Sequence, residues 1–199
     1  MAAWFTVYCT RSLAAVRADD ILASINAADV WTVAEGFGIE DEDAIEAACN
    51  ALQIEPISDQ PGLRFRLSYR PPEFRPVIVH VWDEVQEELE EADELLEDAS
   101  GAGLGRIRSH LGRVTEVVAV ELGWSQMDDM GVVLASLVAE FLAGVADGLV
   151  VDPMDAWWAV DDGVPSQLAG PARQAEPGAA PDGDELALSL AHHRGCRRR

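Results

Sequence analysis

The chain has 199 residues, 36 of them acidic and 14 basic, which gives a formal net charge of −22 at pH 7. This charge argues against a nucleic acid or an anionic membrane surface as a partner, because both require cationic contacts. Hydrophobic residues make up 49% of the chain, a composition typical of a globular domain rather than of a disordered chain.

The three cysteines, Cys9, Cys49 and Cys196, lack the spacing of a zinc site. Scattered cysteines of this kind indicate a reducing compartment. The first residues lack the basic and apolar regions of a signal peptide, and no apolar run approaches the roughly 18 residues of a membrane span. We therefore expect a cytoplasmic protein with no metal ion and no cofactor.

The pattern of apolar residues predicts, in chain order, a strand over 2–9, a helix over 12–28, a strand over 29–37, a helix over 40–52, and strands over 63–69 and 76–82. Ser12 is the expected N-cap of the first helix. The proline-rich connection between the last two strands is typical of an antiparallel hairpin.

The second half is predicted to contain an acidic helix over 83–98, a glycine turn over 100–105, a strand over 113–122, a helix over 127–145, a strand over 148–152 and an aromatic segment over 156–160. Ser125 and Asp128 form the expected capping box of the last helix. The order βαβαββα, then βαβ, predicts an α+β domain with helices packed on a mixed sheet.

Composition changes after Gly163. Residues 164–199 are rich in Pro, Ala and Gly and contain no aromatic residue, so burial there cannot offset the entropy of ordering the chain. We expect a single acidic domain over 1–163, with a sub-boundary at the glycine turn 100–105, followed by a flexible tail.

The most unusual segment is 83–98, in which ten of sixteen residues are acidic and none is basic. Val85, Leu89, Ala92 and Leu96 form one apolar stripe, so most of the acids should face solvent. Two interpretations stay open: a solvated helix face, or a surface that docks on a basic partner. The residues of the candidate partner-binding surface are Glu87, Glu88, Glu90, Glu91, Asp93 and Glu94.

Cys9 ends the first strand, and Ser12 follows it ahead of a predicted helix. With Pro61 just before the third strand, this order resembles the thioredoxin and glutaredoxin family over about half of the chain. The resemblance implies a thiol-redox function, with Cys9 at a helix N-terminus and a cis Pro61 facing it. A cysteine at the end of an aromatic strand is otherwise a small core residue.

His80 shares one face of its strand with Ile78 and Trp82. It is either a structural residue or one half of an acid–base pair with Asp83 or Glu35. It is the second candidate, after Cys9, for a catalytic residue, although none is predicted outright.

Two further features suggest little chemistry. The glycines of "GAGLGR" (101–106) follow a predicted helix and precede a predicted strand, the reverse of the order that points a helix N-terminus at a phosphate. Glu140 is the one acid of its helix after the first turn, and we expect it to be exposed or paired with an arginine.

The segment 127–163 contains a long apolar helix, then Asp-Gly-Leu-Val, an acidic turn and a tryptophan. It resembles the ends of many small bacterial proteins, among them proteins regarded as immunity proteins of toxin systems. In this motif Gly148 is expected to permit a tight turn. The resemblance implies a partner-binding role and contributes no catalytic residue.

These observations predict a non-enzymatic cytoplasmic protein that binds another protein, as an acidic inhibitor or immunity factor for a basic partner. The alternatives are a thioredoxin-like redox protein using Cys9 and a generic interaction module. Neither nucleic acid nor a membrane is expected as a partner.

Overall fold

The structure is a computed structural model that describes residues 2–58, 62–70 and 72–172. Its strands are β1 (Ala2–Cys9), β2 (Gln53–Pro56), β3 (Leu63–Ser68), β4 (Val77–Trp82), β5 (Ala99–Ser100), β6 (Glu116–Gly123), β7 (Gly148–Val151), β8 (Trp157–Asp161) and β9 (Val164–Pro171). Its helices are α1 (Ala18–Ala27), α2 (Val30–Gly36), α3 (Glu42–Ala51), α4 (Gln86–Glu97), α5 (Leu104–Leu111), the 3₁₀ helix η1 (Trp124–Gln126) and α6 (Met130–Ala146). None of these helices has the length and apolar character needed to cross a membrane.

The strands form one sheet in the order β2-β3-β4-β6-β1-β7-β8-β9-β5. The α+β class is confirmed, but every pair of neighbours among the described strands is antiparallel, so the sheet is not mixed as predicted. The reason lies in β1. The crossover from β6 through α6 to β7 leaves β6 and β7 running in the same direction, but β1 lies between them and pairs antiparallel with both.

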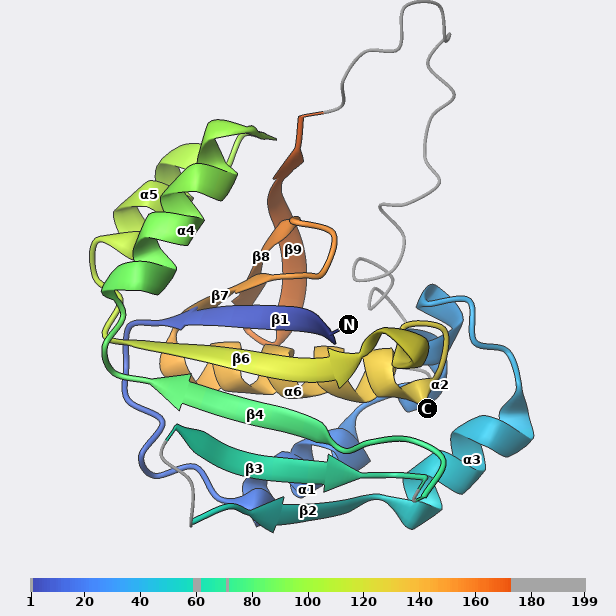
Figure 1. The fold of residues 1–199 in the computed structure, drawn as a ribbon. Coiled ribbons are helices and arrows are strands. Elements are labelled where there is room, and N and C mark those ends of the chain that lie inside the picture. The colour runs from blue at the N-terminus through green and yellow to red at the C-terminus, as the bar shows by residue number, and fades with distance from the viewer. Residues whose placement is uncertain (1, 59–61, 71, 173–199) are drawn as a thin grey trace, which may run out of the picture.

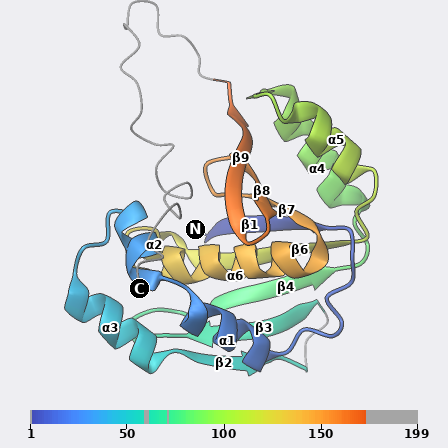
Figure 2. The same cartoon turned by 180° about the vertical axis from the view of Figure 1, so that it is seen from behind.

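Helix α6 packs against the centre of the sheet and is almost wholly buried. Its apolar residues extend around most of its circumference, so it has to be covered on both sides. The sheet covers one side, and α1, α2 and α3 pack against the other (Figure 2). The larger hydrophobic core fills this layer, with Phe5, Leu122 and Leu134 among its fully buried residues.

Helices α4 and α5 cover the opposite face of the sheet at one end only (Figure 1). Leu96 of α4 and Ile107 of α5 pack there in a smaller core with Tyr8 and Trp157, whose rings stack with centroids 5.3 Å apart. His110 of α5 donates from Nε2 to the carbonyl of Tyr8 at 2.8 Å. The rest of this face, over β4, β6 and the start of β1, has no helix on it within the described ranges.

The segment after β1 differs from the prediction, because α1 begins at Ala18 rather than after Ser12. The Ser12 hydroxyl and the Leu13 N–H both donate to the carboxylate of Glu116. This contact ties the segment to β6 before a helix starts, so Ser12 is not an N-cap.

The range 29–37 forms helix α2 and not the predicted strand. Asp29 accepts a hydrogen bond from the Thr32 N–H at 3.2 Å and caps the helix. Val30 and Val33 are buried on one side, at helical spacing. The β-branched residues favour a strand locally, but burial against α6 decides the structure.

Residues 164–171 form β9, so the predicted tail boundary at 163 is wrong. β9 pairs with β8 on one side and with the short β5 on the other. Only Pro165 and Ala169 of this strand are buried, so backbone pairing rather than an apolar pattern holds it in place. Residues 173–199, the rest of the predicted tail, lie outside the described residues.

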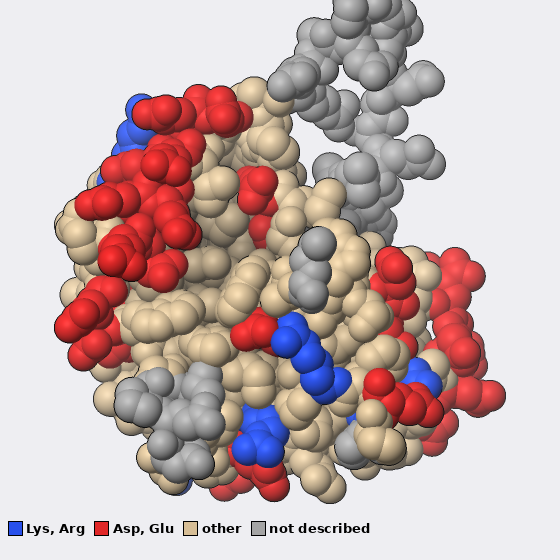
Figure 3. Space-filling model, viewed as in Figure 1, with Lys and Arg blue, Asp and Glu red and all other residues tan. Residues whose placement is uncertain are grey.

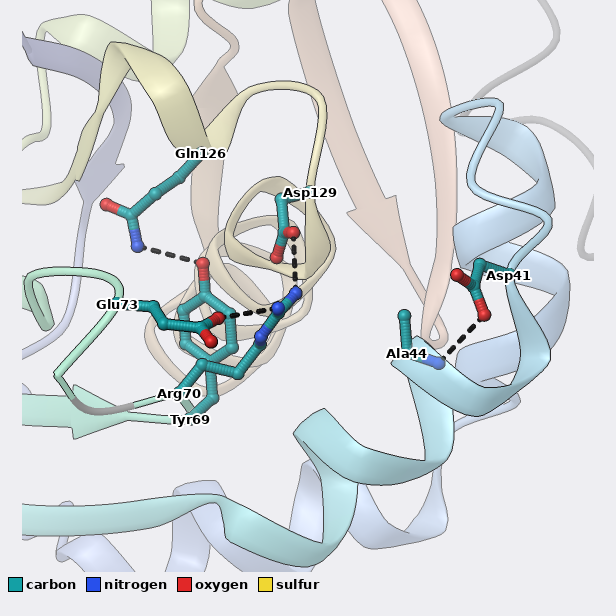
Figure 4. Close-up of polar contacts among 7 residues, drawn as sticks. All are labelled: Asp41, Ala44, Tyr69, Arg70, Glu73, Gln126 and Asp129. Atoms are coloured by element: carbon teal, nitrogen blue, oxygen red, sulfur yellow. Dashed lines mark hydrogen bonds and ion pairs between the residues drawn. The ribbon is translucent and has the colours of Figure 1, made fainter.

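The start of α6 is fixed by polar contacts that the sequence does not reveal. The capping box predicted from Ser125 is not formed, and α6 begins after Asp129, whose carboxylate binds Arg70 at 3.1 Å (Figure 4). The fully buried Gln126 donates to the Tyr69 hydroxyl at 2.9 Å. Both contacts join the end of β3 to the approach to α6.

The turn from α6 into β7 uses Asp147 and not Gly148 as its left-handed residue, with φ 48°. The Thr10 hydroxyl donates to the Asp147 carboxylate at 3.1 Å. Gly148 serves a different purpose, because a Cβ there would lie 3.0 Å from Val7 and 3.1 Å from Ala143. It is needed for the close approach of β7 to β1 and α6.

The glycines after α4 also serve close packing. They follow β5 and lead into α5, an order of strand, turn and helix that the sequence prediction missed. The Gly103 N–H donates to the Leu168 carbonyl at 3.0 Å, and a Cβ on Gly103 would lie 2.5 Å from the Leu168 Cβ. Gly103 therefore holds the α4–α5 pair against β9.

We predict that Gly103→Ala lowers the free energy of unfolding by about 1–3 kcal/mol, because the added methyl group overpacks the contact with β9. Gly105→Ala is the matched control, since nothing lies within 4 Å of a Cβ there. Helix propensity should make that variant equal to or more stable than wild type. Urea unfolding measures both, and equal stabilities would contradict this account of the turn.

Candidate functional site

Helix α4 places its acids as the sequence predicts. Ala92 and Leu96 are buried, and Val85, Leu89 and Leu95 are partly buried against the smaller core. On the opposite side the acids form a continuous band over α4 (Figure 3). Exposed members of the predicted surface are Glu87, Glu90, Glu91, Asp93 and Glu94.

Glu88 is the half-buried member of the set. Burial, with the charges of Glu91 and Glu87 beside it, raises the pKa of its carboxyl group. Its backbone carbonyl accepts a hydrogen bond from the Tyr8 hydroxyl at 3.4 Å. Glu88 therefore lies in the first turn of α4, between the exposed acids and the sheet.

Within residues 2–58, 62–70 and 72–172, no cation pairs with the acids of α4. None of the ion pairs between described residues includes one of them. A groove of about 500 Å³ runs between α4 and the β7–β8 turn. Its charged lining residues are Glu91, Glu94, Asp98 and Asp155, so a cation entering it would meet carboxylates from two separate parts of the chain.

Beside α4, the uncovered part of the sheet carries a row of aromatic side chains. His80 stacks on Trp82 with ring centroids 5.5 Å apart, and Trp4 lies 5.7 Å from His80 on its other side. Trp4 is 40% exposed. Trp82 also packs against the smaller core under α4, so the aromatic row and the acidic helix form one continuous surface.

His80 is paired, but not with Asp83 or Glu35 as predicted. Its Nε2 lies 3.0 Å from Glu121 Oε2, and the other oxygen of Glu121 binds Arg75 at 2.9 Å. Glu121 lies on β6, next to β4 in the sheet. Sequence reasoning missed it because the pairing of β4 with β6 is not encoded in any local pattern.

Cys9 lies at the end of β1, fully buried between β6 and β7. Burial, with the charge of Glu116 nearby, raises the pKa of its thiol to about 12. The next helix begins nine positions later, at Ala18, so Cys9 is not at the N-terminus of α1, where a thiolate would be stabilised. Pro61, the other residue of the thioredoxin-like resemblance, lies outside the described residues.

The glycine turn borders a hollow of about 570 Å³ at the start of α5. Its groups are already bonded: the Gly103 N–H donates to Leu168, and Arg106 makes two hydrogen bonds to Asp161. The described residues contain no group of three or more His, Cys, Asp or Glu side chains placed to hold a metal ion.

Glu140 is neither exposed nor paired with an arginine, contrary to prediction. It is half-buried on α6, and its hydrogen-bond partner is the Ser136 hydroxyl at 3.0 Å. Burial raises the pKa of its carboxyl group to about 7. The Ser136 hydrogen bond opposes this shift without cancelling it.

We predict that Cys9 reacts slowly with a thiol reagent in the folded protein, because the thiol is buried and protonated at neutral pH. In a Cys49→Ser/Cys196→Ser variant, which keeps Cys9 alone, labelling should be at least about 100-fold faster once urea unfolds the chain. Rapid labelling of the folded variant would restore the redox interpretation.

A second prediction concerns Glu140. Its folded pKa lies above the ordinary value of 4.5, so the folded state retains the proton and loses stability as pH rises from about 4.5 to about 7. Glu140→Gln removes this penalty. Its gain in unfolding free energy should rise from near zero at about pH 4 to about 1–3 kcal/mol at about pH 8. Glu46→Gln, at an exposed position, is the control.

The chain matches no protein-family model, no curated protein and no solved structure at a significant level. Neither the thioredoxin-like nor the immunity-protein resemblance therefore gains support from these comparisons.

Proposed function

We propose that this protein is a non-enzymatic, cytoplasmic inhibitor or immunity factor that binds a basic protein partner through the acidic face of α4. The observation that carries the proposal is the uncompensated charge of that face. Its exposed acids have no cationic partner in the described part of the chain, although nine arginines lie in that part.

The arrangement supports binding rather than mere solvation for a physical reason. Glu87 and Glu91, like Glu90 and Glu94, are four residues apart, and each such pair weakens the helix by about 0.2–0.5 kcal/mol. A helix that needed only solubility would be more stable with lysine or arginine at some of these positions. A single-sign band instead creates a field that steers an oppositely charged partner.

The uncovered sheet beside α4 supports the same proposal. Protein interfaces combine a charged rim, which accelerates association, with an apolar and aromatic centre, which slows dissociation. Here the acidic band borders Trp82, His80 and Trp4. Tryptophan is among the residues most enriched at the energetic centres of interfaces.

The prediction that tests the proposal is the loss of association rate in Glu87→Gln/Glu91→Gln/Glu94→Gln. The partner is first captured from the native host on the wild-type protein, identified and purified. At low salt the variant should associate about tenfold more slowly, with little change in dissociation rate, and the difference should shrink at high salt. Surface plasmon resonance at two salt concentrations measures both rates.

The matched control is Glu35→Gln/Glu40→Gln/Glu46→Gln, which removes the same charge from exposed positions in and around α2 and α3. It should bind nearly as wild type does. Equal association rates for wild type and the α4 variant at both salt concentrations would show that α4 is only a solvated face. The α4 variant should also be at least as stable as wild type, since like-charge pairs are relieved.

A further inference from the structure

We propose that Glu121 and Trp4 form a binding site for an arginine side chain. Through this site, at the centre of the interface, the protein would recognise an arginine of its basic partner. The inference rests on the proposed function in one respect, that the partner is a basic protein. The chemistry of the site is argued from its own residues. It names arginine, rather than positive charge in general, as the group that this part of the surface selects.

The carboxylate of Glu121 is oriented to accept a guanidinium. His80 Nε2 holds one oxygen at 3.0 Å, and the stacking of His80 on Trp82 fixes the imidazole. The other oxygen binds the guanidinium of Arg75 at 2.9 Å. Glu121 is 17% exposed whereas Arg75 is 48% exposed, so the carboxylate is fixed while the cation bound to it is accessible to solvent.

Trp4 supplies the second half of the site. It lies directly opposite Glu121 in the pairing of β1 with β6, so the two side chains share one face of the sheet. Its indole is 40% exposed, and no helix covers this part of the sheet in the described ranges. An arginine reaching Glu121 from solvent would therefore pass over the Trp4 ring.

This geometry favours arginine over lysine. A planar guanidinium can stack on an indole and donate in parallel to a carboxylate, whereas an ammonium group makes a point contact and is more strongly hydrated. In the free protein, Arg75 already occupies the carboxylate of Glu121. A partner arginine would replace the exposed Arg75 contact and add the contact with Trp4.

The site is also placed where the partner would meet it. Trp82 connects the two regions, because it stacks on His80 and packs against the smaller core beneath α4. Figure 3 shows the acidic band of α4 bordering a central area that is largely uncharged. A partner attracted by the charge of α4 would therefore bind with one of its arginines at this site.

The test uses two synthetic probes, fluorescent peptides of nine arginines and of nine lysines, and measures their dissociation constants by fluorescence anisotropy. The wild-type protein should bind the arginine peptide about two- to fivefold more tightly, which corresponds to the roughly 0.5–1 kcal/mol of a cation–π contact at an exposed ring. Trp4→Ala should abolish this preference. Trp31→Ala, the control at another exposed tryptophan, should keep it.

Glu121→Gln should likewise abolish the preference, and its unfolding curve shows whether it folds. A second variant avoids that question. Arg75→Gln vacates the carboxylate and should strengthen binding of the arginine peptide more than that of the lysine peptide. Arg66→Gln makes the same charge change at an exposed residue of β3 that makes no ion pair in the described structure, and should strengthen both peptides equally.

The two proposals fail differently. If α4 is not a docking surface, Glu87→Gln/Glu91→Gln/Glu94→Gln will weaken the binding of both peptides no more than Glu35→Gln/Glu40→Gln/Glu46→Gln does. If the arginine site is absent, the α4 variant will weaken both peptides more than that control does, but the preference for arginine will be missing in wild type or will survive Trp4→Ala. Either of the latter results overturns the inference and leaves the proposed function standing.

Discussion

The burial of α6 determines how the rest of the molecule is arranged. A helix that is apolar around most of its circumference has to be enclosed, and here the sheet encloses it on one side and α1, α2 and α3 on the other. Three helices are thereby committed to one face of the sheet. Among the helices of the described residues, the α4–α5 pair is left for the other face, and it covers one end. The uncovered area with Trp4 and His80 is thus a consequence of how α6 is buried.

Charge is distributed unevenly over this scaffold. Of the arginines in the described residues, Arg70, Arg75 and Arg106 bind carboxylates distant in sequence, and Arg17 binds Asp20 of α1. None of these ion pairs reaches α4. Because long-range attraction depends on unpaired charge, the acids of α4 would contribute to the field felt by an approaching protein. The sheet beside it bears few charges and would instead make short-range contacts.

Local patterns predicted the parts of the fold that depend on local physics. The aromatic and β-branched residues of 2–9 predicted β1, and the apolar stripe of 83–98 predicted α4 with its acids facing solvent. The failures share one cause: a partner distant in sequence overrides the local preference. The hydrogen bonds to Glu116 hold the segment before α1, so that this helix begins later than predicted. Packing against α6 favours a helix over 29–37, and pairing with β8 makes 164–171 a strand. Glu121 was missed as the partner of His80 for the same reason, since strand order is not a local property.

The pairing of β5 with β9 has a consequence for the order of events during synthesis. It joins residues 99–100 to residues 170–171. The strand pairing that anchors the α4–α5 pair can therefore form only after about seventy further residues have been synthesised. Until then a nascent chain can contain an intact α6 and central sheet while α4 lacks its final anchor. Because contacts between residues distant in sequence form late, the acidic face would reach its final position among the last events of folding. A ribosome-bound chain that stops before β9 would thus leave uncovered the part of the smaller core that Leu168 and Ala169 contact, and chaperones bind exposed apolar surface of this kind.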